Sequence, residues 1–133
     1  MKTIGMIGIG MMGHGIAANL AKNGYQLFLF DHPGNQPLDA LRASGAVILG
    51  NAAELAARSD VVILVLTGSP QIEAVLTGPE CVLQGLRSGT LVIDCSTALP
   101  DSTLRMAQAV HAAGGRFLDA PMTRRRRRPL RAG

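Results

Sequence analysis

The 133-residue sequence has no tryptophan, only four other aromatic residues, two cysteines and two lysines. Cys81 and Cys95 lie in no CxxC or Cys/His cluster, so they make neither a disulfide framework nor a zinc site. No metal ligand set is expected elsewhere, and the two cysteines are interpreted as buried free thiols in a reducing cytosol. No apolar run approaches the ~20 residues of a membrane span, and no signal peptide precedes the first apolar segment. We therefore expect a soluble, cytoplasmic protein with no membrane partner.

The positive charge is confined to one end of the chain. The formal net charge is +4, but six of the 13 basic residues fall in the last ten positions, at 124–128 and 131. Residues 1–123 carry seven basic and nine acidic residues, a net charge of about −2. The basic balance is therefore no evidence that the folded part binds nucleic acid, and no nucleic-acid partner is expected.

Apolar strand-like runs alternate with helix-like segments along the chain. Strands are predicted at 4–9, 26–30, 47–48, 61–66, 91–93 and 116–118, and helices at 11–23, 38–44, 51–57, from Ser69-Pro70 onward, and at 100–113. The run at 61–66, VVILVL, is typical of a central parallel strand that is buried on both faces. This alternation with short connections predicts an α/β fold, a Rossmann-type doubly wound parallel sheet in a single domain.

A glycine motif joins the first predicted strand to the first predicted helix. The residues Gly8-Ile9-Gly10-Met11-Met12-Gly13 read G-x-G-x-x-G, in the context that makes this motif informative. Gly8 permits a tight turn, Gly10 lets the backbone approach a pyrophosphate, and Gly13 allows close packing of helix and strand. The helix N-terminus offers N–H groups and a positive dipole end to phosphates. The motif predicts a dinucleotide site; packing glycines without a ligand are the alternative.

Asp31 ends the second predicted strand, 18 residues after Gly13. A carboxylate at this place can accept hydrogen bonds from both hydroxyls of the adenosine ribose. It also repels the 2′-phosphate of NADP, so NAD is the expected cofactor. A protonated His32 would weaken this preference.

Three blocks of sequence resemble the β-hydroxyacid dehydrogenase family, which includes 3-hydroxyisobutyrate and tartronate semialdehyde reductases. They are IGMIGIGMMGHGIAANL at 4–20, D-x-S-T at 94–97 and FLDAP at 117–121, with Ile16 in place of a family methionine. The resemblance covers residues 1–123. It implies hydride transfer between a nicotinamide and a small 3-hydroxy acid or its aldehyde, and an oligomeric parent enzyme.

The resemblance also assigns site residues by position. The cofactor set would be Gly8, Ile9, Gly10, Met11, Met12, Gly13, Asp31, Leu66, Thr67 and Thr97. Thr67 replaces a family proline. Thr123 would contact the substrate carboxylate, followed by Arg124 where the family has glycine. Ser96 is a further substrate candidate, although Ser96 and Thr97 could equally cap the local backbone at a strand end.

The family's catalytic lysine has no counterpart here. Lys2 precedes the first strand and Lys22 ends the first helix, so neither matches a lysine on a helix after the nucleotide domain. The helical C-terminal domain of the family is likewise absent from the 133 residues. No catalytic residue is therefore assigned. We expect an NAD-binding domain that is inactive alone; a non-catalytic, NAD-responsive binding module is the alternative.

Residues 124–133 depart abruptly from the resemblance. A block of arginines repels itself, so this tail is expected to be disordered and exposed. A nucleic-acid or nuclear-targeting arm is a second interpretation of the block. A shifted reading frame is favoured, because loss of one base can convert a family-like T-R-T-P-K-E-A-A-A-G-R into T-R-R-R-R-R-P-L-R-A-G. A longer enzyme of which these residues are only a part, or a natural short protein, would also account for the departure.

Overall fold

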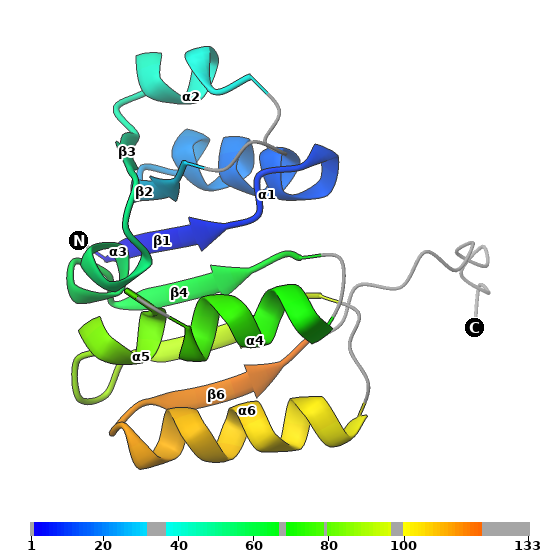
Figure 1. The fold of residues 1–133 in the computed structure, drawn as a ribbon. Coiled ribbons are helices and arrows are strands. Elements are labelled where there is room, and N and C mark those ends of the chain that lie inside the picture. The colour runs from blue at the N-terminus through cyan, green and yellow to red at the C-terminus, as the bar shows by residue number, and fades with distance from the viewer. Residues whose placement is uncertain (1, 32–36, 67–68, 79, 97–99, 121–133) are drawn as a thin grey trace, which may run out of the picture.

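One parallel sheet forms the centre of the molecule in the computed structural model, which describes residues 2–31, 37–66, 69–78, 80–96 and 100–120 (Figure 1). Its strand order is β3-β2-β1-β4-β5-β6. The strands are β1 Thr3–Ile7, β2 Gln26–Phe30, β3 Val47–Leu49, β4 Val61–Leu64, β5 Leu91–Asp94 and β6 Arg116–Asp119. The helices are α1 Met11–Lys22, α2 Asp39–Ala43, α3 Ala52–Ala57, α4 Ser69–Thr77, α5 Val82–Gly85 and α6 Pro100–Ala112. The predicted doubly wound fold is confirmed.

The chain reverses its direction of winding between β3 and β4. Strands β1 to β3 proceed toward one edge of the sheet, and β4 to β6 proceed from β1 toward the other edge. In register, Gly5 lies beside Phe28 on one neighbour and Val62 on the other. All strands are parallel, so their carboxyl ends share one edge (Figure 1). A doubly wound sheet opens a crevice at this edge, where the chain leaves β1 and β4 toward opposite faces of the sheet.

Two hydrophobic clusters fix the helices to the two faces of the sheet. On one face, residues of α3, α4 and α6, such as Leu55, Ile72 and Val110, pack with Val62 and Leu64. On the other face, Ala17 of α1 and Leu41 of α2 belong to the cluster that contains Ile63. The strand β4 is therefore buried on both faces, as its continuous apolar sequence predicts.

The structure departs from the predicted elements in strand length and in one additional helix. Strands β1 and β4 end at Ile7 and Leu64, two residues before the predicted ends, because the chain turns at Gly8 and leaves the sheet after Leu64. Helix α5 was not predicted, because four residues are too short to show a helical period. Within the described residues the longest helix, α6, has 13 residues, and no helix meets the length and polarity that a bilayer span requires.

Candidate functional site

The turn between β1 and α1 lies at the carboxyl edge of the sheet, beside the end of β4. Helix α1 begins at Met11, and the His14 N–H donates its first helical hydrogen bond to the Gly10 carbonyl, at 2.7 Å. The Val65 N–H donates to the Ile7 carbonyl at 2.9 Å, which keeps the chain beyond β4 against this turn. The turn therefore lies in the crevice where the sheet reverses its winding.

Two of the three motif glycines are required by packing. Gly8 has φ +98°, and a Cβ there would collide with the Val65 carbonyl oxygen. A Cβ on Gly13 would collide with the Gly8 carbonyl oxygen and would lie 3.7 Å from the Val65 Cβ. Only glycine at both positions lets α1 start directly against the turn and the end of β4.

Gly10 differs from these two glycines, because a Cβ there would meet no atom of the described residues within 4 Å. Packing does not require this glycine, and the open space lies directly at the N-terminus of α1. The N–H groups of the first turn have no acceptor within the helix. Gly10 at the N-cap position makes no side-chain cap, and the first turn of α1 holds no acidic residue. This arrangement fits the approach of a phosphate group to bare backbone, with the helix dipole favouring its charge.

The other residues of the motif contribute differently. The Ile9 side chain is fully buried in the cluster on the α1 face, so its side chain serves the core. The Met12 side chain is 38% exposed at the first turn of α1. Met12 can therefore cover a ligand that lies against the turn.

Asp31 directly follows β2 at the same edge of the sheet. Its N–H donates to the Leu49 carbonyl at 2.8 Å, and its side chain is exposed. A hollow of about 170 Å³ lies next to it, lined by Phe30, Gly50, Asn51, Ala52, Ala74, Val75 and Glu80. A carboxylate beside a partly apolar hollow can hold a sugar diol and a flat ring together.

Ser96 ties the ends of β4 and β5 together. Its hydroxyl donates to the Leu64 carbonyl at 3.3 Å and accepts from the Leu66 N–H at 2.6 Å. Ser96 is only 3% exposed. The Ser96 hydroxyl therefore caps the local backbone, which is one of the two roles that the sequence left open. This contact positions Leu66 at the edge of the crevice.

Asp94 is a buried carboxyl group that the sequence pattern did not single out. Its Oδ1 accepts from the Ser96 N–H at 2.9 Å, whereas Oδ2 has no hydrogen-bond partner among the described residues. Burial raises the pKa of Asp94, the Ser96 N–H lowers it, and the charge of Asp119 on β6 raises it further. Burial and the charge of Asp94 also raise the pKa of the Cys95 thiol. The only sequence signal for Asp94 was its place in the D-x-S-T block.

We expect Asp94→Asn to make the protein more stable at neutral pH. Above about pH 3.8, the ordinary pKa of this carboxyl, the unfolded chain loses its proton first while the folded protein retains it. The stability that the folded protein gains by retaining the proton on Asp94 is fully present below about pH 3.8. It is lost as the pH rises through the raised pKa of Asp94 in the folded protein. Urea unfolding of both proteins between pH 4 and pH 8 should show the advantage of the variant growing with pH. A pH-independent difference would contradict the assignment.

Several predicted site residues lie outside the described residues. These are Thr67, Thr97 and Thr123, together with the arginines of the tail. The side chain of Met11 also lies outside the described part of the chain, although its backbone starts α1. Their assigned roles stay predictions. In the described ranges, no three His, Cys, Asp or Glu side chains gather to hold a metal ion.

Comparison with known proteins decides the family. Residues 3–126 match the model of the NAD-binding domain of 6-phosphogluconate dehydrogenase. The chain belongs to this family. It is therefore an NAD-binding domain of the hydroxyacid dehydrogenase type, and the predicted cofactor, NAD, is confirmed.

The relatives of this NAD-binding domain include enzymes and a nuclear factor. Mitochondrial 3-hydroxyisobutyrate dehydrogenase of Drosophila melanogaster is 37% identical over 92% of this chain, which covers 37% of that enzyme. Cytokine-like nuclear factor N-PAC of Homo sapiens is 33% identical over 92% of this chain, which covers 22% of that protein. The solved 3-hydroxyisobutyrate dehydrogenase of Mycobacterium tuberculosis, with L-serine, is 32% identical with a TM-score of 0.82.

The matches extend over only part of each relative. The structural match covers 92% of this chain and 41% of the mycobacterial enzyme. The chain thus spans about two fifths of the dehydrogenases that it matches. The predicted resemblance to 3-hydroxyisobutyrate dehydrogenase-like enzymes is confirmed over this span.

Proposed function

We propose that this domain provides the NAD site of a 3-hydroxyacid dehydrogenase or reductase. The space beside Gly10 is the observation that carries the proposal, because glycine there serves no packing purpose and a side chain would fill a phosphate's place. The sequence similarity to 3-hydroxyisobutyrate dehydrogenases supports the proposed substrate class, a small 3-hydroxy acid or its aldehyde. The bound nicotinamide supplies the hydride acceptor or donor.

The residues of this chain would bind and orient the cofactor. Backbone N–H groups at Gly10–Gly13 would hold the pyrophosphate, and Asp31 would accept from the adenosine ribose hydroxyls. The hollow beside Phe30 would receive the adenine ring. Ser96 would keep Leu66 in position against the cofactor, with Thr67 and Thr97 nearby in the sequence. The roles of Thr123 and Ser96 toward a substrate carboxylate remain part of the proposal.

We further propose that residues 1–133 alone bind NAD without oxidising a hydroxy acid. Hydroxyl oxidation needs a group to accept the proton, and such a group contributes roughly 10²–10⁴-fold. Neither lysine can supply it at the glycine turn. Lys2 precedes the amino end of β1, and Lys22 ends α1, about 16 Å along the helix from its start.

NADH fluorescence titration with a parallel turnover assay tests this proposal. We expect saturable binding of NADH, weaker binding of NADPH, and no turnover of 3-hydroxyisobutyrate with NAD. Asp31→Asn should reduce the preference for NADH over NADPH, because it removes the charge that repels the 2′-phosphate. Turnover by the 133-residue chain would contradict the proposal that this chain is inactive by itself. Tighter binding of NADPH by the unaltered chain would contradict the role of Asp31.

A second function is favoured by one comparison. The match to nuclear factor N-PAC covers nearly all of this chain. Because N-PAC is named as a nuclear factor and not as an enzyme, this match supports the alternative to a dehydrogenase, a non-catalytic, NAD-responsive binding module. The NADH titration and the turnover assay, applied to a longer polypeptide that contains this domain, separate the two functions. Turnover by that polypeptide supports the dehydrogenase. NADH binding without turnover supports the binding module.

A further inference from the structure

A larger hollow lies at the opposite edge of the sheet, where β1, β4, β5 and β6 begin. Its volume is about 750 Å³, within the usual range of roughly 300–1,000 Å³ for small-molecule sites. The side chains that define its chemistry are Lys2, Asp60, Arg87, Ser88, Thr90 and Arg116. We call these six residues the amino-edge pocket. It is separated from the glycine turn by the length of the strands, so it is no part of the dinucleotide site.

The amino-edge pocket concentrates positive charge. It combines the cations Lys2, Arg87 and Arg116 with the single carboxylate of Asp60, a net charge of about +2. Residues 1–123 as a whole carry a net charge of about −2, so the net charge of the pocket is opposite in sign to that of the chain before the arginine tail. Ser88 and Thr90 add two neutral polar residues to the lining. The composition matches an anionic ligand.

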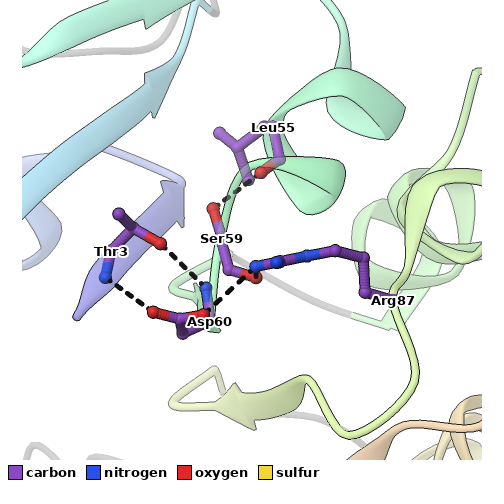
Figure 2. Close-up of polar contacts among 5 residues, drawn as sticks. All are labelled: Thr3, Leu55, Ser59, Asp60 and Arg87. Atoms are coloured by element: carbon purple, nitrogen blue, oxygen red, sulfur yellow. Dashed lines mark hydrogen bonds and ion pairs between the residues drawn. The ribbon is translucent and has the colours of Figure 1, made fainter. Parts of the chain in front are cut away.

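Arg87 is held in place by a polar network (Figure 2). Its Nη2 donates to the Ser59 carbonyl at 2.8 Å and to Asp60 Oδ1 at 3.2 Å. Asp60 is fixed in turn, because its Oδ2 accepts from the Thr3 N–H at 3.1 Å and its N–H donates to Thr3 Oγ1 at 3.1 Å. The Thr3 N–H is the main cause that lowers the pKa of Asp60, so Asp60 stays ionised and orients the guanidinium.

The network of Arg87 leaves it able to bind a further anion. An arginine has five N–H donors, and the contacts of Arg87 within the described residues engage only Nη2. A guanidinium fixed by one carboxylate and one carbonyl loses less freedom on binding than a free side chain. Arg87 is therefore a preorganised donor on the wall of the pocket.

Backbone hydrogen bonds fix Arg87 and Arg116 relative to each other. The Thr90 N–H donates to the Arg87 carbonyl at 3.1 Å, and Gly89 has φ +86°, as in a type II turn. The Gly89 N–H donates to the Gly114 carbonyl at 2.8 Å, and the Arg116 N–H donates to the Thr90 carbonyl at 2.8 Å. The turn before β5 and the start of β6 therefore carry Arg87 and Arg116 on one hydrogen-bonded backbone frame.

We propose that the amino-edge pocket binds a small multivalent anion of the phosphate class through Lys2, Arg87 and Arg116. Planar guanidinium groups pair well with phosphate oxygens, and an ammonium adds a third charge. Free pyrophosphate and a phosphorylated metabolite share this chemistry.

A ¹H–¹⁵N NMR titration of the full chain with inorganic pyrophosphate tests the site. NADH is kept saturating to block the Gly8–Gly13 turn, and salt is held near 0.15 M to screen the arginine tail. We expect the largest shifts at the amides of Ser88–Leu91 and Arg116. Arg116→Gln and Lys2→Gln should each weaken pyrophosphate binding roughly tenfold or more, the effect of one charged hydrogen bond. Arg87 is left intact because its loss would also break its contacts with Ser59 and Asp60.

Arg42→Gln is the matched control, since Arg42 is an exposed arginine on α2 outside the pocket. It removes one charge and should leave the pyrophosphate affinity within about twofold. An equal loss of affinity in the Arg42 variant would overturn the proposal, because it would indicate only general charge attraction. Shifts confined to residues 8–13 or 124–131 would also overturn it. Glucose 6-phosphate should produce the same pattern of shifts, whereas equally tight binding of citrate would contradict selectivity for phosphate.

Discussion

Replacing Gly10 by alanine should weaken NADH binding at least tenfold while the fold stays intact. A Cβ at Gly10 meets no atom within 4 Å in the part of the chain that the structure describes, so the substitution introduces no clash there. The same Cβ occupies the space through which a pyrophosphate would approach the first turn of α1. A tenfold loss corresponds to about 1.4 kcal/mol of binding free energy, less than the sum of two charged hydrogen bonds to phosphate. Fluorescence titration with NADH measures it, and circular dichroism with thermal unfolding verifies the fold.

Gly15→Ala is the matched control for this prediction. Gly15 lies on the same helix five residues later, and a Cβ there also meets nothing within 4 Å. Its alanine variant should bind NADH with unchanged affinity and gain about 0.5–1 kcal/mol of stability, because alanine is the better helix former. If both variants bind as tightly as the unaltered protein, the N-terminus of α1 is not the pyrophosphate site.

Gly8→Ala should destabilise the whole domain by roughly 3 kcal/mol or more. Two independent costs add at this position. At φ +98° an L-residue is strained by about 1–3 kcal/mol. The new Cβ would also collide with the Val65 carbonyl oxygen, so the end of β4 or the turn must shift. Since domains of this size are typically stable by about 5–15 kcal/mol, urea unfolding should show a much lower midpoint.

Gly24→Ala separates backbone strain from collision. Gly24 follows α1 with φ +88°, close to the value at Gly8, but a Cβ there meets nothing within 4 Å. The free energy of unfolding of this variant should fall only by the cost of backbone strain, roughly 1–2 kcal/mol. Equal losses in the two variants would show that the chain near Val65 moves aside freely, and would contradict the rigid packing of the turn.

The sequence predicted the centre of the sheet well because the central strands β1 and β4 are buried along nearly their whole length. Runs such as QLFLF and VVILVL are apolar at nearly every position, and parallel strands require that pattern. The glycine turn was also predicted, since a strand, three spaced glycines and a helix follow one another locally. The start of α3 is also set locally, because the Asn51 side chain accepts from the Glu54 N–H at 3.0 Å and so caps the helix.

Features that depend on residues far apart in the chain were missed. Helix α5 is only four residues long, and its position follows from packing: a Cβ on Gly85 would collide with the Ala53 carbonyl oxygen. The buried state of Asp94 depends on neighbours in β4, β5 and β6, which no local pattern reports. The bond from Arg87 to Asp60 joins residues 27 positions apart.

The sequence alone determined the class of fold, the place of the glycine turn and the acidic residue after the second strand. These properties are local, because they arise from hydrophobic pattern and from the backbone freedom of glycine within a few residues. Only the tertiary structure decided that Gly8 and Gly13 serve packing whereas Gly10 faces open space. It likewise gathered Lys2, Arg87 and Arg116 around one hollow. Such placements arise when parallel strands distant in sequence align in register, so that their amino ends and carboxyl ends form two separate edges.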